Sequence, residues 1–181
     1  MLTTRDISII EFVTIYKVAS TSTISHFFFS SISACHKRLK ILSDNGSIKR
    51  ARDSINNEYV YFKKLPKQLK HSLLVTEFYR EASGRYEIVN FKIEPVIGNI
   101  RPDAVFGYIK NGKKYLGLLE VEISHKGFDY LKYEKFKTSE NYKQYFPTMP
   151  TIFIIGDNIK QNLIKDITFK IISENMNNVV L

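Results

Sequence analysis

Cysteine, clustered histidine and long apolar runs are scarce in this sequence, and each shortage excludes a class of protein. One cysteine among 181 residues leaves no partner for an intramolecular disulfide, and four scattered histidines form no cluster at the spacing of zinc ligands. No apolar run reaches the roughly 18 residues of a membrane-spanning helix. The opening residues, Met-Leu-Thr-Thr-Arg-Asp, lack the charged-then-apolar pattern of a secretory signal. We therefore expect a globular, cytoplasmic protein without redox chemistry, zinc or a membrane partner.

Positive charge, by contrast, is plentiful and unevenly placed. The formal net charge is +9 at pH 7. Residues 1–80 carry 13 Lys and Arg against 6 Asp and Glu, whereas residues 81–181 carry 14 against 12. Cationic side chains near nucleic-acid phosphates release counterions, which favours binding in a salt-dependent way. The alternative is a solvated cationic face that serves only solubility.

Residues 31–50 have the pattern of a helix followed by a basic strand. Apolar residues recur at the spacing of a single helical face and predict one packed side: Ile32, Cys35, Leu39 and Leu42. Gly46 follows the last turn, where glycine ends a helix at little steric cost because it adopts positive φ readily. Ile48 then begins an extended, basic run. A helix, a glycine and a strand in this order are what a winged helix requires.

The flanking residues complete the expected domain. Residues 5–19 and 24–29 predict two further helices, and serine and threonine residues are available to cap the second and third. Residues 48–52 and 58–63 predict two strands around turn-forming residues, which together make a wing. We therefore predict a winged helix-turn-helix over residues 1–65.

Such a module places its third helix in the major groove of double-stranded DNA. The predicted base-reading side chains project from the free faces of that helix: Ser33, Ala34, His36 and Lys37. The predicted phosphate contacts are basic residues of the helix and wing: Lys40, Lys49, Arg50 and Arg52. Ser31 at the helix start, with Asn56 and Asn57 at the wing tip near a minor groove, completes the set. This binding needs no cofactor. Alternatively, the module docks a protein, and His36 is a surface imidazole without a contact.

After the wing, residues 66–84 predict a connector helix that could also dimerise, and residues 85–181 predict an α/β domain. Its strands are expected at 86–93, 104–109, 115–123 and 151–155, with a tight turn at Asn111-Gly112. Helices are expected at 127–145 and after the last strand, and the tail 174–181 is expected to fray. The fold class predicted for the whole chain is α/β, with α+β character.

Acidic residues in this second domain form a separate candidate site. Asp103 follows Arg101-Pro, and strand alternation puts Glu120 and Glu122 on one side, next to Asp103 across a hairpin. Converging carboxylates can hold a divalent cation, which activates water for phosphodiester attack. The predicted metal ligands are Asp103 and Glu120, and the metal would be Mg²⁺ or Mn²⁺. The alternative is that the glutamates pair with Arg101 or nearby lysines as part of the fold.

The order Pro-Asp, hairpin, acidic residues and helix resembles the PD-(D/E)XK nuclease core. That core carries a lysine where this sequence has Glu122, and a glutamate cannot stabilise developing negative charge as an ammonium does. Lysines of the following segment are candidates to replace it: Lys126, Lys132 and Lys135. If the domain were active, the resemblance would make Asp103, Glu120, Glu122 and Lys126 its catalytic residues. We expect a nuclease-like domain that has lost catalysis.

Taken as a whole, the order of these motifs resembles the replication-relaxation family of Gram-positive plasmids and phages, over about residues 5–157. The resemblance implies a winged helix on a restriction-endonuclease-like domain, linked to replication or relaxation of the element's DNA. We therefore expect a sequence-specific double-stranded DNA-binding protein, forming a homodimer and acting in replication, conjugative transfer or transcription. The alternatives are a metal-dependent endonuclease or nickase, and an adaptor that recruits a relaxase or replication initiator.

Overall fold

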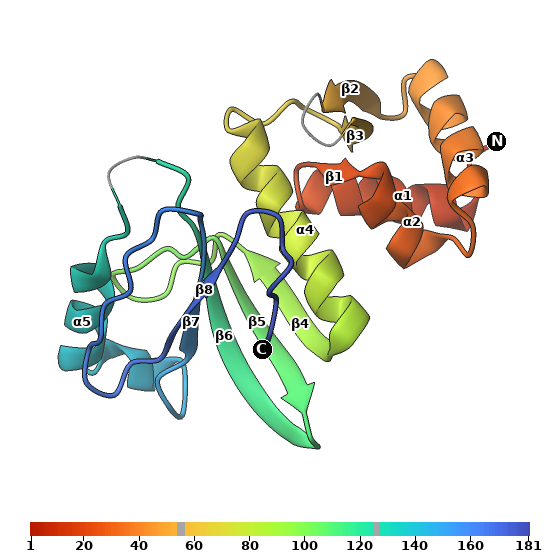
Figure 1. Cartoon of the computed structure of the whole chain (residues 1–181). Helices are drawn as coiled ribbons and strands as arrows, with labels where there is room; N and C mark the ends of the chain where they lie inside the picture. The colour runs from red at the N-terminus through yellow and green to blue at the C-terminus, as the bar shows by residue number, and fades with distance from the viewer. Residues whose placement is uncertain (54–56, 125–126) are drawn as a thin grey trace. The chain divides into compact units, whose positions relative to one another are not determined.

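The computed structural model describes residues 1–53, 57–124 and 127–181, and it has a mixed α/β fold (Figure 1). The chain forms two compact units, Met1–Arg80 and Glu81–Leu181, and the division falls inside helix α4. Each unit contains its own β-sheet. In the described part of the chain, no helix has both the length and the apolar character needed to cross a membrane.

The first unit combines helices with a small antiparallel sheet. Its elements are α1 (Thr4–Ile15), β1 (Ala19–Ser20), α2 (Thr21–Phe28), α3 (Ile32–Asp44), β2 (Lys49–Asp53), β3 (Glu58–Phe62) and the first part of α4 (Leu69–Arg85). The sheet order is β1-β3-β2. The helices pack around buried side chains such as Ile9, Ile24, Leu39 and Tyr61. Three helices and two strands are present in the predicted order, although α2 begins at Thr21 and not at residue 24.

The first helix ends earlier than the sequence pattern predicts. The apolar pattern extends to residue 19, but α1 ends at Ile15, and Lys17 has a φ of 70°, which a right-handed helix cannot accommodate. The next residues form β1, whose backbone pairs with β3. Helix α1 therefore ends before residue 19, because the backbone of Ala19 and Ser20 pairs with β3 although the local apolar pattern would continue the helix.

Helix α3 has the predicted packed face, with one exception. Cys35, Leu39 and Leu42 are fully buried. Ile32, which was predicted to pack with them, is 46% exposed, because it is the first residue of the helix and lies beyond the reach of the core. Gly46 has a φ of 76°, as its predicted role at the helix end requires.

The second unit contains a five-stranded mixed sheet. Its elements after α4 are β4 (Glu87–Ile93), β5 (Ala104–Lys110), β6 (Lys113–Val121), α5 (Tyr130–Thr138), the 3₁₀ helix η1 (Asn141–Gln144), β7 (Thr151–Ile155) and β8 (Phe169–Ile172). The order is β4-β5-β6-β7-β8, with β4 to β6 antiparallel and β6 to β8 parallel. Asn111 and Gly112 both have positive φ, which confirms the tight turn between β5 and β6.

Two expectations for the end of the chain are wrong. The helix expected after residue 155 is absent from the described residues, and β8 instead pairs with β7. The tail does not fray, because Val179 and Leu181 are 0% and 1% exposed. The Arg85 guanidinium donates to the Val179 carbonyl at 3.0 Å, which ties the tail down. Both differences come from partners distant in sequence, which local patterns do not report.

Candidate functional site

Helix α3 presents a polar face from the first unit. Ser33, Ala34, His36 and Lys37 are all exposed, while Cys35 and Leu39 between them are fully buried. Ser31 precedes the helix as its N-cap residue and is exposed, although its side chain makes no capping hydrogen bond. The helix is therefore held by one side, and the predicted base-reading side chains all lie on accessible faces.

A buried ion pair fixes this helix against α1. Arg38 Nε donates to Asp6 Oδ1 at 2.7 Å, and Arg38 Nη2 contacts Asp6 Oδ2. Asp6 is fully buried and also forms a capping box with Thr3. Hydrogen bonding from Arg38 holds the pKa of Asp6 well below its usual range. Sequence reasoning missed this pair, since its partners are 32 positions apart and only the Thr3-x-x-Asp6 cap is visible locally.

The β2–β3 pair divides the predicted phosphate contacts between its two faces. The side chains of Arg50 and Arg52 lie over the ring of Tyr59, with the guanidinium carbons 4.9 and 5.4 Å from its centre. Tyr59 packs against the same core that buries α3. Lys49 pairs in register with Phe62, and strand alternation puts it on the opposite face, where the core contains Phe62 and Leu73. Arg50 and Arg52 therefore lie on the face of the β2–β3 pair that packs on the same core as α3, and Lys49 lies on the other face.

Several of these cations already have anionic or polar neighbours. Lys40 Nζ lies 2.9 Å from Asp44 Oδ2, and Arg50 Nη2 lies 3.9 Å from Asp44 Oδ1. Hydrogen bonding from Lys40 lowers the pKa of Asp44. Arg52 contacts the side-chain oxygen of Asn57, which is exposed. Exposed ion pairs of this kind are weak, so a phosphate can replace the carboxylate. Asn56 lies outside the described residues.

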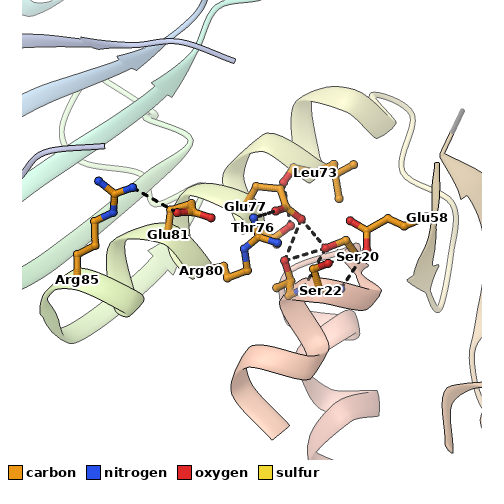
Figure 2. A network of polar contacts seen from close by, with 10 residues as sticks. Ser20, Ser22, Glu58, Leu73, Thr76, Glu77, Arg80, Glu81 and Arg85 are labelled. Carbon is orange, nitrogen blue, oxygen red and sulfur yellow. Dashed lines mark hydrogen bonds and ion pairs between the residues drawn. The ribbon is translucent and has the colours of Figure 1, made fainter. Parts of the chain in front are cut away.

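Two carboxylates hold the start of α2, as Figure 2 shows. Glu77 of α4 accepts a hydrogen bond from the Ser20 hydroxyl and pairs with Arg80 at 2.8 Å. Burial raises the pKa of Glu77. Glu58 accepts hydrogen bonds from the backbone N–H and the hydroxyl of Ser22, at 3.1 and 2.9 Å. Negative charge at a helix N-terminus is stabilising, so this network positions α2, the helix that packs on α3.

In the second unit, Asp103 and Glu120 lie near one another, and each has partners. Asp103 Oδ2 accepts from the Val121 N–H at 2.7 Å. Glu120 Oε1 lies 2.6 Å from Lys132 Nζ and accepts from the Tyr133 hydroxyl. Burial raises the pKa of Glu120, although Lys132 opposes the shift. The predicted pairing of Glu120 with a lysine is confirmed, and the lysine comes from α5.

Glu122 does not join this cluster. It follows the end of β6, and its carboxylate accepts a hydrogen bond from the Ser124 N–H at 2.8 Å. Arg101 pairs with Glu94 at 2.9 Å, so the predicted alternative of a pair between Arg101 and Glu120 or Glu122 is wrong among the described residues. Across the described residues, no three His, Cys, Asp or Glu side chains are placed to hold a metal ion together. Lys126 lies outside the described residues, and Lys135 is exposed on α5.

Comparison with protein-family models, curated proteins and solved structures gives no match to this chain.

Proposed function

We propose that the chain is a sequence-specific double-stranded DNA-binding protein whose α3 enters the major groove as the third helix of a winged helix-turn-helix. The observation that carries the proposal is the division of α3 into two sides. Its buried side is held by Leu39 and by the Arg38–Asp6 pair, while Ser33, His36 and Lys37 are exposed. A rigid helix with small and polar exposed side chains is suited to reading base edges.

Phosphate contacts would come from the cations that share the face of α3. Arg50 and Arg52 are positioned by Tyr59, and Lys40 lies one turn beyond Lys37 on α3. Their present partners, Asp44 and Asn57, are at the surface, where exchange for a phosphate costs little. The uneven charge of the sequence supports this assignment, since the first 80 residues carry most of the excess positive charge.

A homodimer acting on plasmid or phage DNA, in replication, transfer or transcription, is part of the proposal. It draws its support from the resemblance to the replication-relaxation family and from the usual use of paired half-sites by helix-turn-helix proteins.

The test is selection of duplexes from a random pool at stated salt, followed by affinity measurements on the selected site. Specific sites typically bind about 10³- to 10⁷-fold more tightly than random duplex. Lys37→Ala and His36→Ala should reduce affinity for the selected site and relax base preference. Unchanged affinity and preference in both variants would exclude α3 as the reading helix. Selection of no preferred duplex would instead favour the adaptor that recruits a relaxase or replication initiator.

A metal-dependent nuclease is the second candidate, favoured by one observation. Lys132 reaches Glu120 from α5, as a lysine displaced from the nuclease pattern would, and Asp103 lies beside them. The donor set itself fits an ion pair better than Mg²⁺ or Mn²⁺, because Glu120 Oε1 is engaged by both Lys132 and Tyr133. Supercoiled and linear DNA incubated with the protein and Mg²⁺ or Mn²⁺ should stay intact. Cleavage that disappears in Asp103→Ala and Glu120→Ala would reverse the order of the two candidates.

A further inference from the structure

The sheet of the second unit has a groove on one face that the proposed function does not use. The groove has a volume of about 520 Å³ and is lined on the sheet side by Val105, Gly107 and Leu116. Tyr145 and Pro147, which follow η1, form part of its lining from outside the sheet. Its size lies within the range of about 300–1,000 Å³ that is usual for ligand pockets.

Gly107 is the residue that opens this groove. It lies in the middle of β5, where a glycine weakens a strand and commonly marks the close approach of a ligand or another backbone. A Cβ built at this position meets nothing closer than 3.9 Å. The glycine is therefore not required by a neighbouring atom, and its effect is to leave space on the sheet. Across the sheet, β4 is irregular between Ile88 and Asn90, beside the same glycine.

The lining combines aromatic and apolar surface with few polar groups. Tyr145 is 50% exposed and offers the face or edge of its ring, beside the buried ring of Phe146. Asn90 and Lys114 are exposed at the groove, where an amide and an ammonium can donate hydrogen bonds. An aromatic surface with a cation beside it is the arrangement that binds a base and its phosphate in single strands.

The face of the sheet that holds the groove carries lysines on β4 and β6. By strand register, Lys92 and Lys114 lie on the same face as Gly107, together with Glu87 of β4 and Glu120 of β6. Glu120 is paired with Lys132, whereas Lys110 and Lys113 of the hairpin lie on the opposite face. A peptide strand would instead be expected to pair with the free edge of β4, not to fill a pocket on the sheet face.

We infer that this groove binds a base of single-stranded nucleic acid, with Tyr145 contacting the base and Lys114 the phosphate. The inference goes beyond the proposed function, because it assigns a second nucleic-acid site, for a different form of DNA, to residues of the other unit.

The test is the affinity of the full chain for a fluorescently labelled single-stranded oligothymidylate, measured by anisotropy at fixed salt. Gly107→Leu fills the groove and should weaken binding by about tenfold or more, which is the loss of one stacked base. Tyr145→Ala should weaken it similarly. Lys114→Ala should weaken binding and reduce its salt dependence, since one phosphate contact is lost. Lys113→Ala is the matched control, because Lys113 is also exposed but does not line the groove, and it should change affinity less.

The outcomes separate this inference from the proposed function. Gly107→Leu should keep duplex affinity, whereas Lys37→Ala should lose duplex affinity and keep single-strand binding. Thermal unfolding of each variant establishes that it is folded, and Tyr145→Ala serves if Gly107→Leu is not. Equal single-strand affinity in the folded variants and the wild type overturns the inference. The inference is also overturned if an apolar dye bound in the groove is displaced by a peptide and not by the oligothymidylate.

Discussion

The two units differ in where the candidate DNA-binding cations lie. In the first unit, Lys40 and Arg50 are at the surface and their ion pairs with Asp44 are weak, while Arg38 of α3 is committed to the buried Asp6. In the second unit, the ion pair of Glu120 and Lys132 is largely buried at the end of a sheet, with 12% and 30% of each side chain exposed. Accessible positive charge can exchange its partners for a ligand, whereas a buried pair is committed to the fold. The first unit is therefore the better candidate for binding DNA.

Two buried carboxylates, Asp6 in the first unit and Glu120 in the second, have pKa shifts of opposite sign. Around Asp6, hydrogen bonding from Arg38 outweighs burial, and the pKa falls. Around Glu120, burial outweighs Lys132, and the pKa rises. Two guanidinium nitrogens contact the Asp6 carboxylate, while one ammonium and the Tyr133 hydroxyl contact Glu120. Bidentate recognition by arginine, with hydrogen bonds from Thr3, lowers the pKa of Asp6, whereas desolvation by burial is the largest influence on the pKa of Glu120.

The largest effect is expected from removing the buried acid under α3. Asp6→Ala should lower the free energy of unfolding by about 3 kcal/mol, since it removes a cap and two charged hydrogen bonds. Urea unfolding measures it. Asp44→Ala is the matched control, because Asp44 also pairs with a cation of α3 but at the surface, and its urea midpoint should stay close to that of the wild type. Equal losses in the two variants would contradict the distinction between buried and surface pairs.

A second test uses the pH dependence of stability. The contribution of Asp6 is present above its unfolded pKa of 3.8 and is lost as the pH falls toward its lower folded value. The gap between wild type and Asp6→Ala should therefore narrow below pH 3.8. The pKa of Glu120 is raised by folding, so the folded state favours the protonated carboxyl. The wild type should therefore lose stability relative to Glu120→Gln as the pH rises above 4.5. Urea unfolding at several pH values measures both differences in stability. If the difference for Asp6→Ala and the difference for Glu120→Gln changed with pH in the same direction, this contrast would be ruled out.

A smaller effect, on DNA affinity, is expected to differ between residues on the two faces of β2. Arg50→Ala should weaken binding to all duplexes and reduce the salt slope by about one, because one phosphate contact is lost. Lys49→Ala, on the neighbouring residue of the opposite face, should change neither quantity. Anisotropy titrations at several salt concentrations measure both. If Lys49→Ala had the larger effect, the duplex would have to approach the other face of the strand pair.

The smallest effect is expected from the surface acid between these cations. Asp44→Ala removes one negative charge and releases Lys40 and Arg50, so affinity for random duplex should rise by about twofold to fivefold. The same titrations measure it, with Asp53→Ala as a control for loss of a negative charge on the other face of β2. A fall in affinity would show that Asp44 positions these cations for binding.

Local signals were sufficient for much of the fold and for part of the site. The spacing of Cys35, Leu39 and Leu42 predicted the buried face of α3, and the free faces followed from it. Asn111-Gly112 predicted a turn because both residues tolerate positive φ. Ile32 was misassigned because periodicity does not show where the core ends along a helix. Lys49, Arg50 and Arg52 were grouped by charge, and strand alternation alone would have separated Lys49 from the other two.

The amino-acid sequence by itself determined the order of helices and strands up to β7 apart from β1, the two-sided character of α3 and the basic excess of the first 80 residues, since these depend on near neighbours and composition. Only the tertiary structure decided that Arg38 reaches Asp6, that Lys132 reaches Glu120, and that residues 169–172 form β8 beside β7. The physical reason is that a buried charge or an open strand edge takes whichever partner folding brings within hydrogen-bond distance. That partner can come from any part of the chain.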